Sequence, residues 1–526
     1  MNVIDDQWHY LAQIKRLSRQ AFNKLLSQIS PNASLISEQD VIDTRPPWEV
    51  TAKPRPLILE NPLQQITITL ANHIYFEMKA LPSTLSARLR RLASFSNPVF
   101  FKTQALRFST HGIPRFISCA RIEQGPGNSK WLALPRGCLD DALALLKENN
   151  IDVQIDDKRV LGTKLSGMKP LLTLRKNQQA AVKEMSKHDA GILYAPTAFG
   201  KTVTAIVMIA KRKANTLILV HSRQLLDQWQ ERLSAFLPEA EVGIIRGGKK
   251  KPTGIIDIAT YQSLVNKKDN TISPIVQDYG HVIVDECHHV SAPRFEMVLN
   301  EVRAKYVLGL TATPERQDGH QKIIFMAAGP IRHKVKISSE GRFEQEVQVH
   351  QFYDTPPLHL SQPEKRPKIT DAYRWIMENE NRTRRIVSDV IHNVREAKHP
   401  IVLTERREHA EMINNLLKEV GIDSVILKGA MKAAERKHVD EHLHSAQVVV
   451  DTGKYVGEGF DLPRLDTLFL AMRIAWKGTL AQYAGRIHRE SDGKLRVTIH
   501  DYVDCSLPML QRMFNKRIWT PPILQR

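Results

Sequence analysis

The sequence predicts an α/β protein in which two successive domains, each a parallel sheet flanked by helices, follow a small α+β domain. From about residue 171, short apolar runs typical of buried strands alternate with helical stretches: "GILYA", "TLILV", "IIDIA", "HVIVD" and "YVLGL". The pattern breaks in a polar, proline-containing segment at about 331–370. It resumes with "PIVLT", "SVILK", "QVVVDT" and "TLFLA" up to about 505. Apolar strands separated by helices are typical of parallel sheets covered on both faces.

The sequence before these two domains has a different pattern of apolar residues and prolines. "YLAQIKRLSRQAFNKLLSQI" has apolar residues at helix spacing, and the prolines of "TRPPWEVTAKPRPLILENP" forbid a continuous helix. Residues 1–64 are therefore expected to be a helical segment with a Pro-rich linker, and 65–165 the small α+β domain. The other expected boundaries are 171–335 for the first α/β domain, 336–380 for a linker or insert, and 381–526 for the second α/β domain with a C-terminal tail.

The composition indicates a polyanionic partner. Lys and Arg total 75 against 56 acids in 526 residues, which gives a formal net charge of +19 and favours nucleic acid binding. No apolar run approaches the roughly 20 residues that span a bilayer. The first residues carry two acids and no apolar signal core, so we expect a cytoplasmic protein. The four cysteines lie far apart with no CxxC pair, which argues against a zinc site and a disulfide framework.

The stretch "LYAPTAFGKTV" predicts a phosphate-binding loop between a strand and a helix. Lys201 can reach the β- and γ-phosphates, and the Thr202 hydroxyl can bind Mg²⁺. Ala198 stands where such loops usually have glycine; we expect the methyl group to be tolerated, because backbone amides make most of the phosphate contacts. The loop residues expected to hold the nucleotide are Thr197, Ala198, Phe199, Gly200, Lys201 and Thr202.

A carboxylate pair follows a second apolar strand in "HVIVDECHHV". At the carboxyl end of the strand, Asp285 can hold Mg²⁺ and Glu286 can orient the attacking water, as phosphoryl transfer requires. A solvated acidic turn is the alternative reading, and the phosphate-binding loop upstream disfavours it. His288 and His289 have no further His or Cys in register for a metal site, so His288 is expected to couple motifs across the nucleotide cleft.

These motifs resemble the DEAD/DEAH class of superfamily 2 helicases over about residues 171–505. The resemblance implies two tandem RecA-like motor domains that use ATP and Mg²⁺. "LRKNQQAAV" is similar to the adenine-side motif of the family, which implicates Arg175 and Gln178. "LVHSRQLLDQW" and "IATYQSL" resemble strand-contact motifs, which implicates Arg223, Gln224 and Thr260 on the nucleic-acid backbone.

Three further motifs extend the resemblance. "GLTATPER" is similar to the motif that couples hydrolysis to strand movement, with Thr311 and Thr313 in the coupling positions. "VVVDTGKYVGEGFDLPRLDTLFLA" resembles the motif that contacts strand and nucleotide, and "QYAGRIHRE" resembles the arginine-finger motif. An arginine supplied across a cleft can raise the rate of phosphoryl transfer by ~10³–10⁵, so hydrolysis is expected to require cleft closure. The residues implied by these two motifs are Thr452, Gly459, Asp461, Gln482, Arg486 and Arg489.

The motif details are closest to XPB-like duplex-DNA translocases and to restriction-subunit-type helicases, including those of TOTE conflict systems. Arg316-Gln317-Asp318 stands where XPB-like proteins carry Arg-Glu-Asp, and because the central acid is missing, this element does not by itself support an unwinding role. The domain at 65–165 resembles the DNA-binding domains of XPB-like and UvsW-type phage helicases. Its candidate phosphate contacts are Lys102, Arg107, Arg115 and Arg136, and its Phe100, Phe101 and Phe116 are expected in the core rather than as stacking platforms.

The expected function is therefore an ATP-dependent DNA helicase or translocase acting on duplex or branched DNA. One alternative is an RNA helicase. Another is a nucleotide-dependent DNA-binding scaffold, or the motor subunit of a repair, restriction or antiviral defence complex. An intrinsic nuclease built on Glu77-x-Lys79 is disfavoured, because the region before it is broken by prolines rather than forming a strand hairpin.

Overall fold

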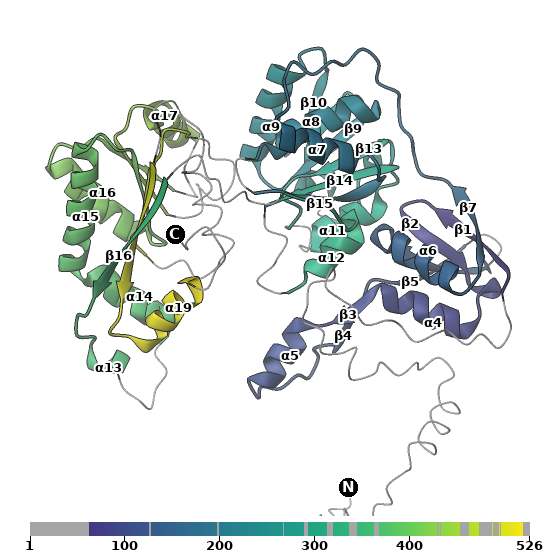
Figure 1. Cartoon of the computed structure of the whole chain (residues 1–526), viewed down its shortest axis with the longest axis horizontal. Helices are drawn as coiled ribbons and strands as arrows, with labels where there is room; N and C mark the ends of the chain where they lie inside the picture. The colour runs from purple at the N-terminus through teal and green to yellow at the C-terminus, as the bar shows by residue number, and fades with distance from the viewer. Residues whose placement is uncertain are drawn as a thin grey trace, which may run out of the picture.

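The computed structural model describes most of the chain from residue 63 onward (Figure 1). The described residues are 63–125, 128–196, 199–266, 268–288, 293–312, 319–335, 344–361, 368–428, 431, 433–452, 462–472, 487, 494 and 496–518. Within these residues, no helix has both the length and the apolar character that crossing a membrane requires.

The first domain is a five-stranded sheet with two helices packed on it. The strand order is β5-β6-β2-β1-β7, antiparallel except for the parallel pair β1–β7. Helices α4 (Ser83–Leu92) and α6 (Leu139–Glu148) bury leucines such as Leu85 and Leu146 in the core beneath the sheet. The strands are β1 (Gln65–Leu70), β2 (His73–Glu77), β5 (Arg121–Gln124), β6 (Lys130–Pro135) and β7 (Asp152–Asp157), with short 3-10 turns η2 (Met78–Ala80) and η4 (Arg136–Cys138).

The second domain is an eight-stranded sheet of order β11-β10-β12-β9-β13-β14-β8-β15, parallel except for the antiparallel edge pair β10–β11. Its strands are β8 (Ala190–Tyr194), β9 (Thr216–Val220), β10 (Val242–Arg246), β11 (Lys249–Lys251), β12 (Ile256–Thr260), β13 (His281–Val284), β14 (Tyr306–Thr311) and β15 (Ile331–Lys334).

Helices cover both faces of this sheet, which explains why its strands read as continuous apolar runs. One core contains side chains of α7 (Lys176–Met185), α8 (Lys201–Arg212) and α9 (Arg223–Phe236), and the other contains side chains of α10 (Tyr261–Leu264), α11 (Pro293–Glu301) and α12 (Gln321–Ala328). The 3-10 turn η5 (Pro274–Gln277) lies in the second core. In a parallel sheet the carboxyl ends of the strands share one edge. The loop after β8 and the acidic residues after β13 both begin at this edge.

The third domain is a six-stranded parallel sheet of order β16-β21-β20-β17-β19-β18. Its strands are β16 (Glu344–Phe352), β17 (Pro400–Leu403), β18 (Ser424–Leu427), β19 (Val448–Asp451), β20 (Thr467–Leu470) and β21 (Arg496–Asp504). Its helices are α13 (Leu358–Ser361), α14 (Ile369–Glu378), α15 (Glu380–Arg395), α16 (Arg407–Glu419), α17 (Ala433–Leu443) and α19 (Pro508–Ile518). The predicted fold class is confirmed: two RecA-like α/β domains follow a small α+β domain.

The expected linker or insert at 336–380 is wrong for the part that the structure describes. β16 pairs with β21 along its full length, from Glu344–Arg496 to Phe352–Asp504, and forms the edge of the third sheet. Ala372, Tyr373 and Ile376 of α14 are buried in a cluster with Leu507 and with Leu510 of α19. This segment therefore belongs to the third domain, the second of the two RecA-like domains.

The first domain packs directly on the second domain, the first of the two RecA-like domains. Arg136 donates a 3.0 Å hydrogen bond from Nη1 to the carbonyl of Ala304 and also donates from Nη2 to the carbonyl of Val302. Asn72 donates from Nδ2 to the carbonyl of Asn300 at 2.8 Å. Gly137 lies so close to α12 that an added Cβ would meet the carbonyl oxygen of Phe325 at 2.0 Å. The two domains therefore share an interface at which their backbones come close together.

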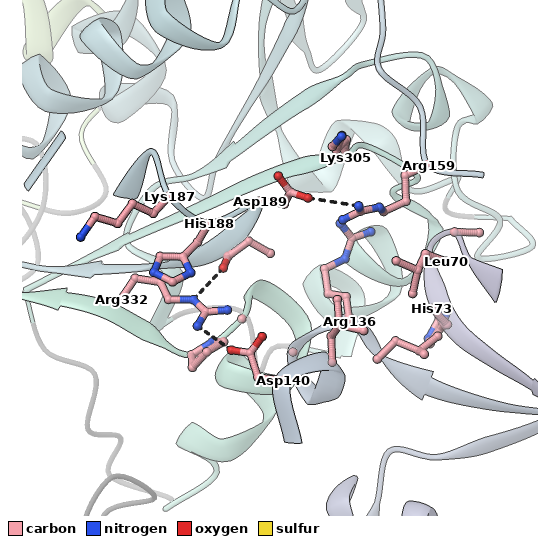
Figure 2. Close-up of a pocket in the computed structure, with 17 residues that line it drawn as sticks. Leu70, His73, Arg136, Asp140, Arg159, Lys187, His188, Asp189, Lys305 and Arg332 are labelled. Carbon is pink, nitrogen blue, oxygen red and sulfur yellow. Dashed lines mark hydrogen bonds and ion pairs between the residues drawn. The ribbon is translucent and has the colours of Figure 1, made fainter. Parts of the chain in front are cut away.

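A cavity of about 250 Å³ lies at this interface (Figure 2). The arginines that line it have partners within the chain: Arg159 pairs with Asp189 at 3.1 Å, and Arg332 pairs with Asp140 at 2.5 Å. Burial and the neighbouring charge of Arg159 lower the pKa of Arg136 to about 10. The expectation that Arg136 contacts nucleic-acid phosphates is wrong, because its guanidinium donates to backbone carbonyls inside the protein.

Candidate active site

The predicted phosphate-binding loop follows β8 and ends at the first residue of α8. Gly200 is the residue before the helix and has a φ of +89°, a conformation that side chains rarely adopt. A Cβ at this position would also lie 2.5 Å from Nε2 of Gln178. Lys201 follows as the first helical residue, and its Nζ donates to the carbonyl of Ala195 at 3.3 Å. The helix N-terminus is therefore directed at the loop, which is the arrangement that binds phosphate.

Arg175 and Gln178 hold the loop from the side. The side chains of both residues donate to the carbonyl of Phe199, from Nη2 at 2.6 Å and from Nε2 at 2.7 Å. Oε1 of Gln178 accepts a 2.9 Å hydrogen bond from the backbone amide of Arg175, which caps the N-terminus of α7. Because Gln178 is buried, these contacts fix the last turn of the loop before Gly200.

Asp285 and Glu286 follow β13 and lie opposite the loop. Asp285 is buried, and its Oδ1 accepts the backbone amide of Glu286 at 2.9 Å. Oε1 of Glu286 lies 3.7 Å from Nζ of Lys201. Glu286 has a φ of +44°, a strained conformation for a residue with a side chain, and such strain is concentrated at functional sites.

The indole of Trp229 orients Asp285. Nε1 of Trp229, on α9, donates a 2.7 Å hydrogen bond to Oδ2 of Asp285. Burial and the adjacent charge of Glu286 raise the pKa of Asp285, whereas the hydrogen bond from Trp229 and the charge of Lys201 act to lower it. Asp285 is buried and Glu286 is half-buried, and a divalent cation bound beside the two carboxylates would stabilise their negative charge.

His288 connects the acidic pair to the predicted coupling motif. Its Nδ1 lies 3.4 Å from Oε2 of Glu286 and 3.2 Å from Oγ1 of Thr311. Both His288 and Thr311 are buried, at 5% and 1% exposure. Thr311 is the last residue of β14, so a continuous series of contacts runs from Lys201 through Glu286 and His288 to this strand end.

The residues predicted to contact the nucleic-acid strand lie farther along the same sheet edge. Thr260 ends β12 beside Val220 of β9, and its Oγ1 lies 2.6 Å from Oγ of Ser263. Arg223 begins α9 after the cap of Ser222, and its side chain is 68% exposed. The Gln224 side chain is only partly exposed. Within the part of the chain that the structure describes, no hydrogen bond or ion pair joins these residues to the loop, which fits a separate surface for a second ligand.

In the second motor domain, Thr452 follows β19 at the carboxyl edge of the sheet. Its Oγ1 donates to the carbonyl of Leu427 at 3.3 Å. Thr404 follows the neighbouring strand β17, and its backbone amide donates to the carbonyl of Asp451 at 2.9 Å. Several predicted residues lie outside the described part of the chain: Thr197, Ala198, Thr313, Gly459, Asp461, Gln482, Arg486 and Arg489.

Comparison with known proteins addresses the identity of this chain. Residues 171–316 match the family described as "Type III restriction enzyme, res subunit", and residues 382–491 match "Helicase conserved C-terminal domain". The DNA 3'-5' translocase XPB2 of Sulfurisphaera tokodaii is 29% identical over 203 residues, which are 38% of this chain and 45% of that protein. A protein of Escherichia phage T5 whose name proposes a helicase is 26% identical and covers 71% of this chain and 79% of its own length. These matches support a superfamily 2 helicase.

Within that superfamily, the matches support the XPB-like and restriction-subunit type. A protein of Acanthamoeba polyphaga mimivirus whose name proposes an ATP-dependent RNA helicase is 26% identical and covers 77% of both chains. The crystal structure of T4 UvsW aligns over 86% of this helicase and 96% of that chain, at 16% identity and a TM-score of 0.38. Proteins of this helicase family bind a nucleotide with a divalent metal, hydrolyse it and bind nucleic acid.

Two residues of this helicase were not singled out by sequence reasoning. Trp229 lies within a predicted strand-contact motif, but nothing in the sequence connects it to Asp285, 56 positions later. A fully buried tryptophan needs a partner for its N–H, and that general rule is the one available signal. Arg382 is fully buried in the second motor domain, where its Nε lies 3.1 Å from Oδ1 of Asp504. A charged residue on an amphipathic helix gives no sequence signal for such burial.

Proposed function

We propose that this helicase is an ATP- and Mg²⁺-dependent motor that translocates along or unwinds duplex or branched DNA in the cytoplasm. The observation that carries the proposal is the series of contacts from Lys201 through Glu286 and His288 to Thr311. A group beside the γ-phosphate site is thereby connected to a strand end from which the coupling motif continues. Such a connection is what a motor needs to convert hydrolysis into movement.

The residues around the loop fit ATP hydrolysis. Lys201 would bind the β- and γ-phosphates, and the backbone amides of the loop would bind the phosphate oxygens at the N-terminus of α8. Thr202 and Asp285 would hold Mg²⁺, which would neutralise charge that develops on the phosphates. Glu286 would orient the attacking water, and its partner His288 would hold the carboxylate in place. Arg175 and Gln178 would recognise the base beside the loop.

The second motor domain would complete the site. Arg486 and Arg489 would stabilise the charge of the transition state, with Gln482 positioned beside the γ-phosphate, and Gly459 and Asp461 would contact the nucleotide. Thr452 would contact the nucleic-acid strand, as would Arg223, Gln224 and Thr260 of the first motor domain. Since the two sets of groups lie on different domains, each hydrolysis cycle would close and open the cleft between them.

We favour DNA over RNA as the nucleic acid along which this helicase moves, because the relatives named XPB are named as acting on DNA. RNA is the second candidate because of the mimivirus relative, which matches a larger share of this chain. The matches cover 45% and 62% of the first two relatives' own length, so the nucleic acid is inferred from part of those proteins. Additional subunits of a repair or defence complex are compatible with the same motor.

Steady-state ATP hydrolysis by the full chain, with no nucleic acid, with duplex DNA, with single-stranded DNA and with duplex RNA, tests this proposal. Hydrolysis should be Mg²⁺-dependent and should be stimulated several-fold more by duplex DNA than by RNA. Stimulation by RNA alone would transfer the proposal to RNA. Binding of DNA without turnover in any condition would favour a scaffold and exclude the motor.

A further inference from the structure

A separate arm projects from the first domain (Figure 1). It consists of β3 (Ser94–Ser96), α5 (Pro98–Ala105) and β4 (Phe116–Ser118), and we call residues 94–118 the arm. β3 and β4 form a two-stranded antiparallel ribbon that is not part of the five-stranded sheet. In Figure 1, α5 lies at the far end of the arm, away from that sheet. The arm is therefore a projection with its own small framework.

Asn97 fixes the shape of the arm. Its buried side chain accepts the backbone amide of Val99 at 3.1 Å, which caps α5, and donates to the carbonyl of Pro114 at 2.8 Å. Its backbone amide donates to the carbonyl of Arg115 at 2.9 Å. One residue thus ties together the start of the helix and the returning chain, so that the tip is held in a defined position.

The tip of the arm exposes apolar side chains. All six residues 104–109 are exposed, including Leu106 at 52% and Phe108 at 68%. The amide of Phe108 donates to the carbonyl of Thr103 at 3.1 Å, and Arg107 between the two apolar residues has a φ of +58°. Burial of such side chains is favourable, so one turn that presents both Leu106 and Phe108 to solvent indicates a binding surface.

The charge around this tip selects the partner. Residues 78–122 contain eight cations and no acid, in a chain that carries 56 acids over 526 residues. Lys102 and Arg107 are exposed beside the apolar tip. The Arg115 guanidinium lies over the rings of Phe101 and Phe116, at 5.8 Å and 5.7 Å, so those half-buried rings support a cation. Apolar and basic groups together fit a nucleic acid whose base faces are accessible.

The base of the arm is attached to the first motor domain. Nε2 of His320, just before α12, lies 3.4 Å from Oδ1 of Asn97, and its ring meets that of Phe95 edge-on at 6.5 Å between centroids. An added Cβ on Gly319 would come within 2.7 Å of Pro98. Gly319 and His320 follow the coupling motif in the sequence, eight and nine residues after Thr311. The arm therefore keeps one direction relative to the motor.

We propose that the arm binds DNA at the point where the two strands of a duplex separate. Phe108 stacks on the terminal base pair of the duplex, and Lys102 and Arg107 contact the phosphates of the diverging strands. This inference rests on the proposed function, since it names the DNA structure that the same motor recognises. It explains why apolar and basic residues share one projection, because a strand junction offers a base face and phosphates side by side.

Binding of the full chain to a forked DNA with 2-aminopurine at the first paired position, and to a plain duplex of the same sequence, tests the proposal. The wild type should prefer the fork and change the fluorescence of the base analogue. Phe108→Ala should weaken fork binding by about tenfold, as expected for loss of one base–aromatic stack. It should lose the fluorescence change, and affinity for the plain duplex should fall much less. Phe108→Trp should restore both fork signals.

The matched control is Ile155→Ala, which removes an apolar side chain of 49% exposure from β7 of the same domain and should leave fork preference intact. Melting temperatures should be equal for the two alanine variants. If Phe108→Ala retains the fork affinity and fluorescence change, or loses fork and duplex affinity equally, the proposal is overturned. ATP hydrolysis is recorded in parallel with the forked and the plain DNA. Stimulation by the plain duplex supports the proposed function even if the arm fails this test. No stimulation by either DNA would overturn both the proposed function and the role of the arm.

Discussion

The indole N–H of Trp229 donates a 2.7 Å hydrogen bond to the carboxylate of Asp285, which connects α9 to the acidic pair after β13. Both side chains are buried. The same helix begins with Arg223 and Gln224, which we expect to contact nucleic acid. A shift of α9 when nucleic acid binds would therefore change the position of the carboxylate proposed to hold Mg²⁺.

Trp229→Phe should weaken Mg²⁺ binding while the packing of α9 is largely kept. The hydrogen bond from Trp229 lowers the pKa of Asp285, so its removal raises that pKa, and protonation then competes with Mg²⁺ at a higher pH. The acid limb of the pH–rate profile should move to higher pH, and the Mg²⁺ concentration for half-maximal hydrolysis should rise several-fold. Trp131→Phe, which removes a 2.8 Å hydrogen bond to Ser129 in the first domain, is the control. Identical profiles for both variants would contradict the role of Trp229.

Lys201→Ala should abolish ATP hydrolysis and weaken ATP binding. Removal of the ammonium leaves the β- and γ-phosphate charges without their main protein cation. Turnover and the dissociation constant for ATP are measured on the same preparation. Lys187→Ala, at an exposed lysine paired with Glu184, should match the wild type in both measurements. An active Lys201→Ala enzyme would show that the loop is not the nucleotide site.

Glu286→Gln should separate binding from chemistry. The amide keeps the shape of the side chain but cannot accept a proton from the attacking water. ATP should bind within a few-fold of the wild-type affinity, whereas the rate of a single turnover should fall by roughly 10²-fold or more. Hydrolysis at near the wild-type rate would exclude Glu286 as the residue that orients the water.

Arg382→Met should destabilise the second motor domain because it leaves the carboxylate of Asp504 buried without its partner. Loss of one partner of a buried ion pair typically costs about 3–5 kcal/mol. Arg384→Met on the same helix, where an exposed arginine pairs with Glu380, should cost only about 0–1 kcal/mol. Urea unfolding followed by circular dichroism compares the two variants, and equal midpoints would contradict the account of Arg382.

The basic residues of the first domain should contribute to the salt dependence of DNA binding. Each neutralised phosphate steepens the log–log slope by about 0.9 on duplex DNA, so Lys102→Gln with Arg115→Gln should flatten it by roughly 1.8. Lys147→Gln with Lys158→Gln, on other surfaces of the same domain, should leave the slope unchanged. These substitutions are a cleaner test than removal of the whole domain, because removal would uncover the interface around Gly137. Equal slopes for both pairs would exclude phosphate contacts by Lys102 and Arg115.

The sequence predicted what depends on local pattern. Apolar runs located the strands, and the position of Lys201 after a strand located the loop, because both signals lie within a few residues. Contacts between distant segments were not predictable. β16 pairs with β21, about 150 positions later, and as an edge strand it carries too few apolar residues to stand out. Arg136 was read as a surface cation because a sequence does not show which backbone carbonyls will surround a side chain.

The measurement that tests the central claim most directly is triplex displacement on a plain DNA duplex. Release of a third strand requires movement along the duplex but no separation of its two strands, so it isolates translocation from unwinding. The wild type should release the third strand only with ATP and Mg²⁺, and Glu286→Gln should not release it although it still binds ATP and DNA. A wild-type enzyme that hydrolyses ATP on this substrate yet leaves the triplex intact would contradict the claim that hydrolysis drives movement along DNA.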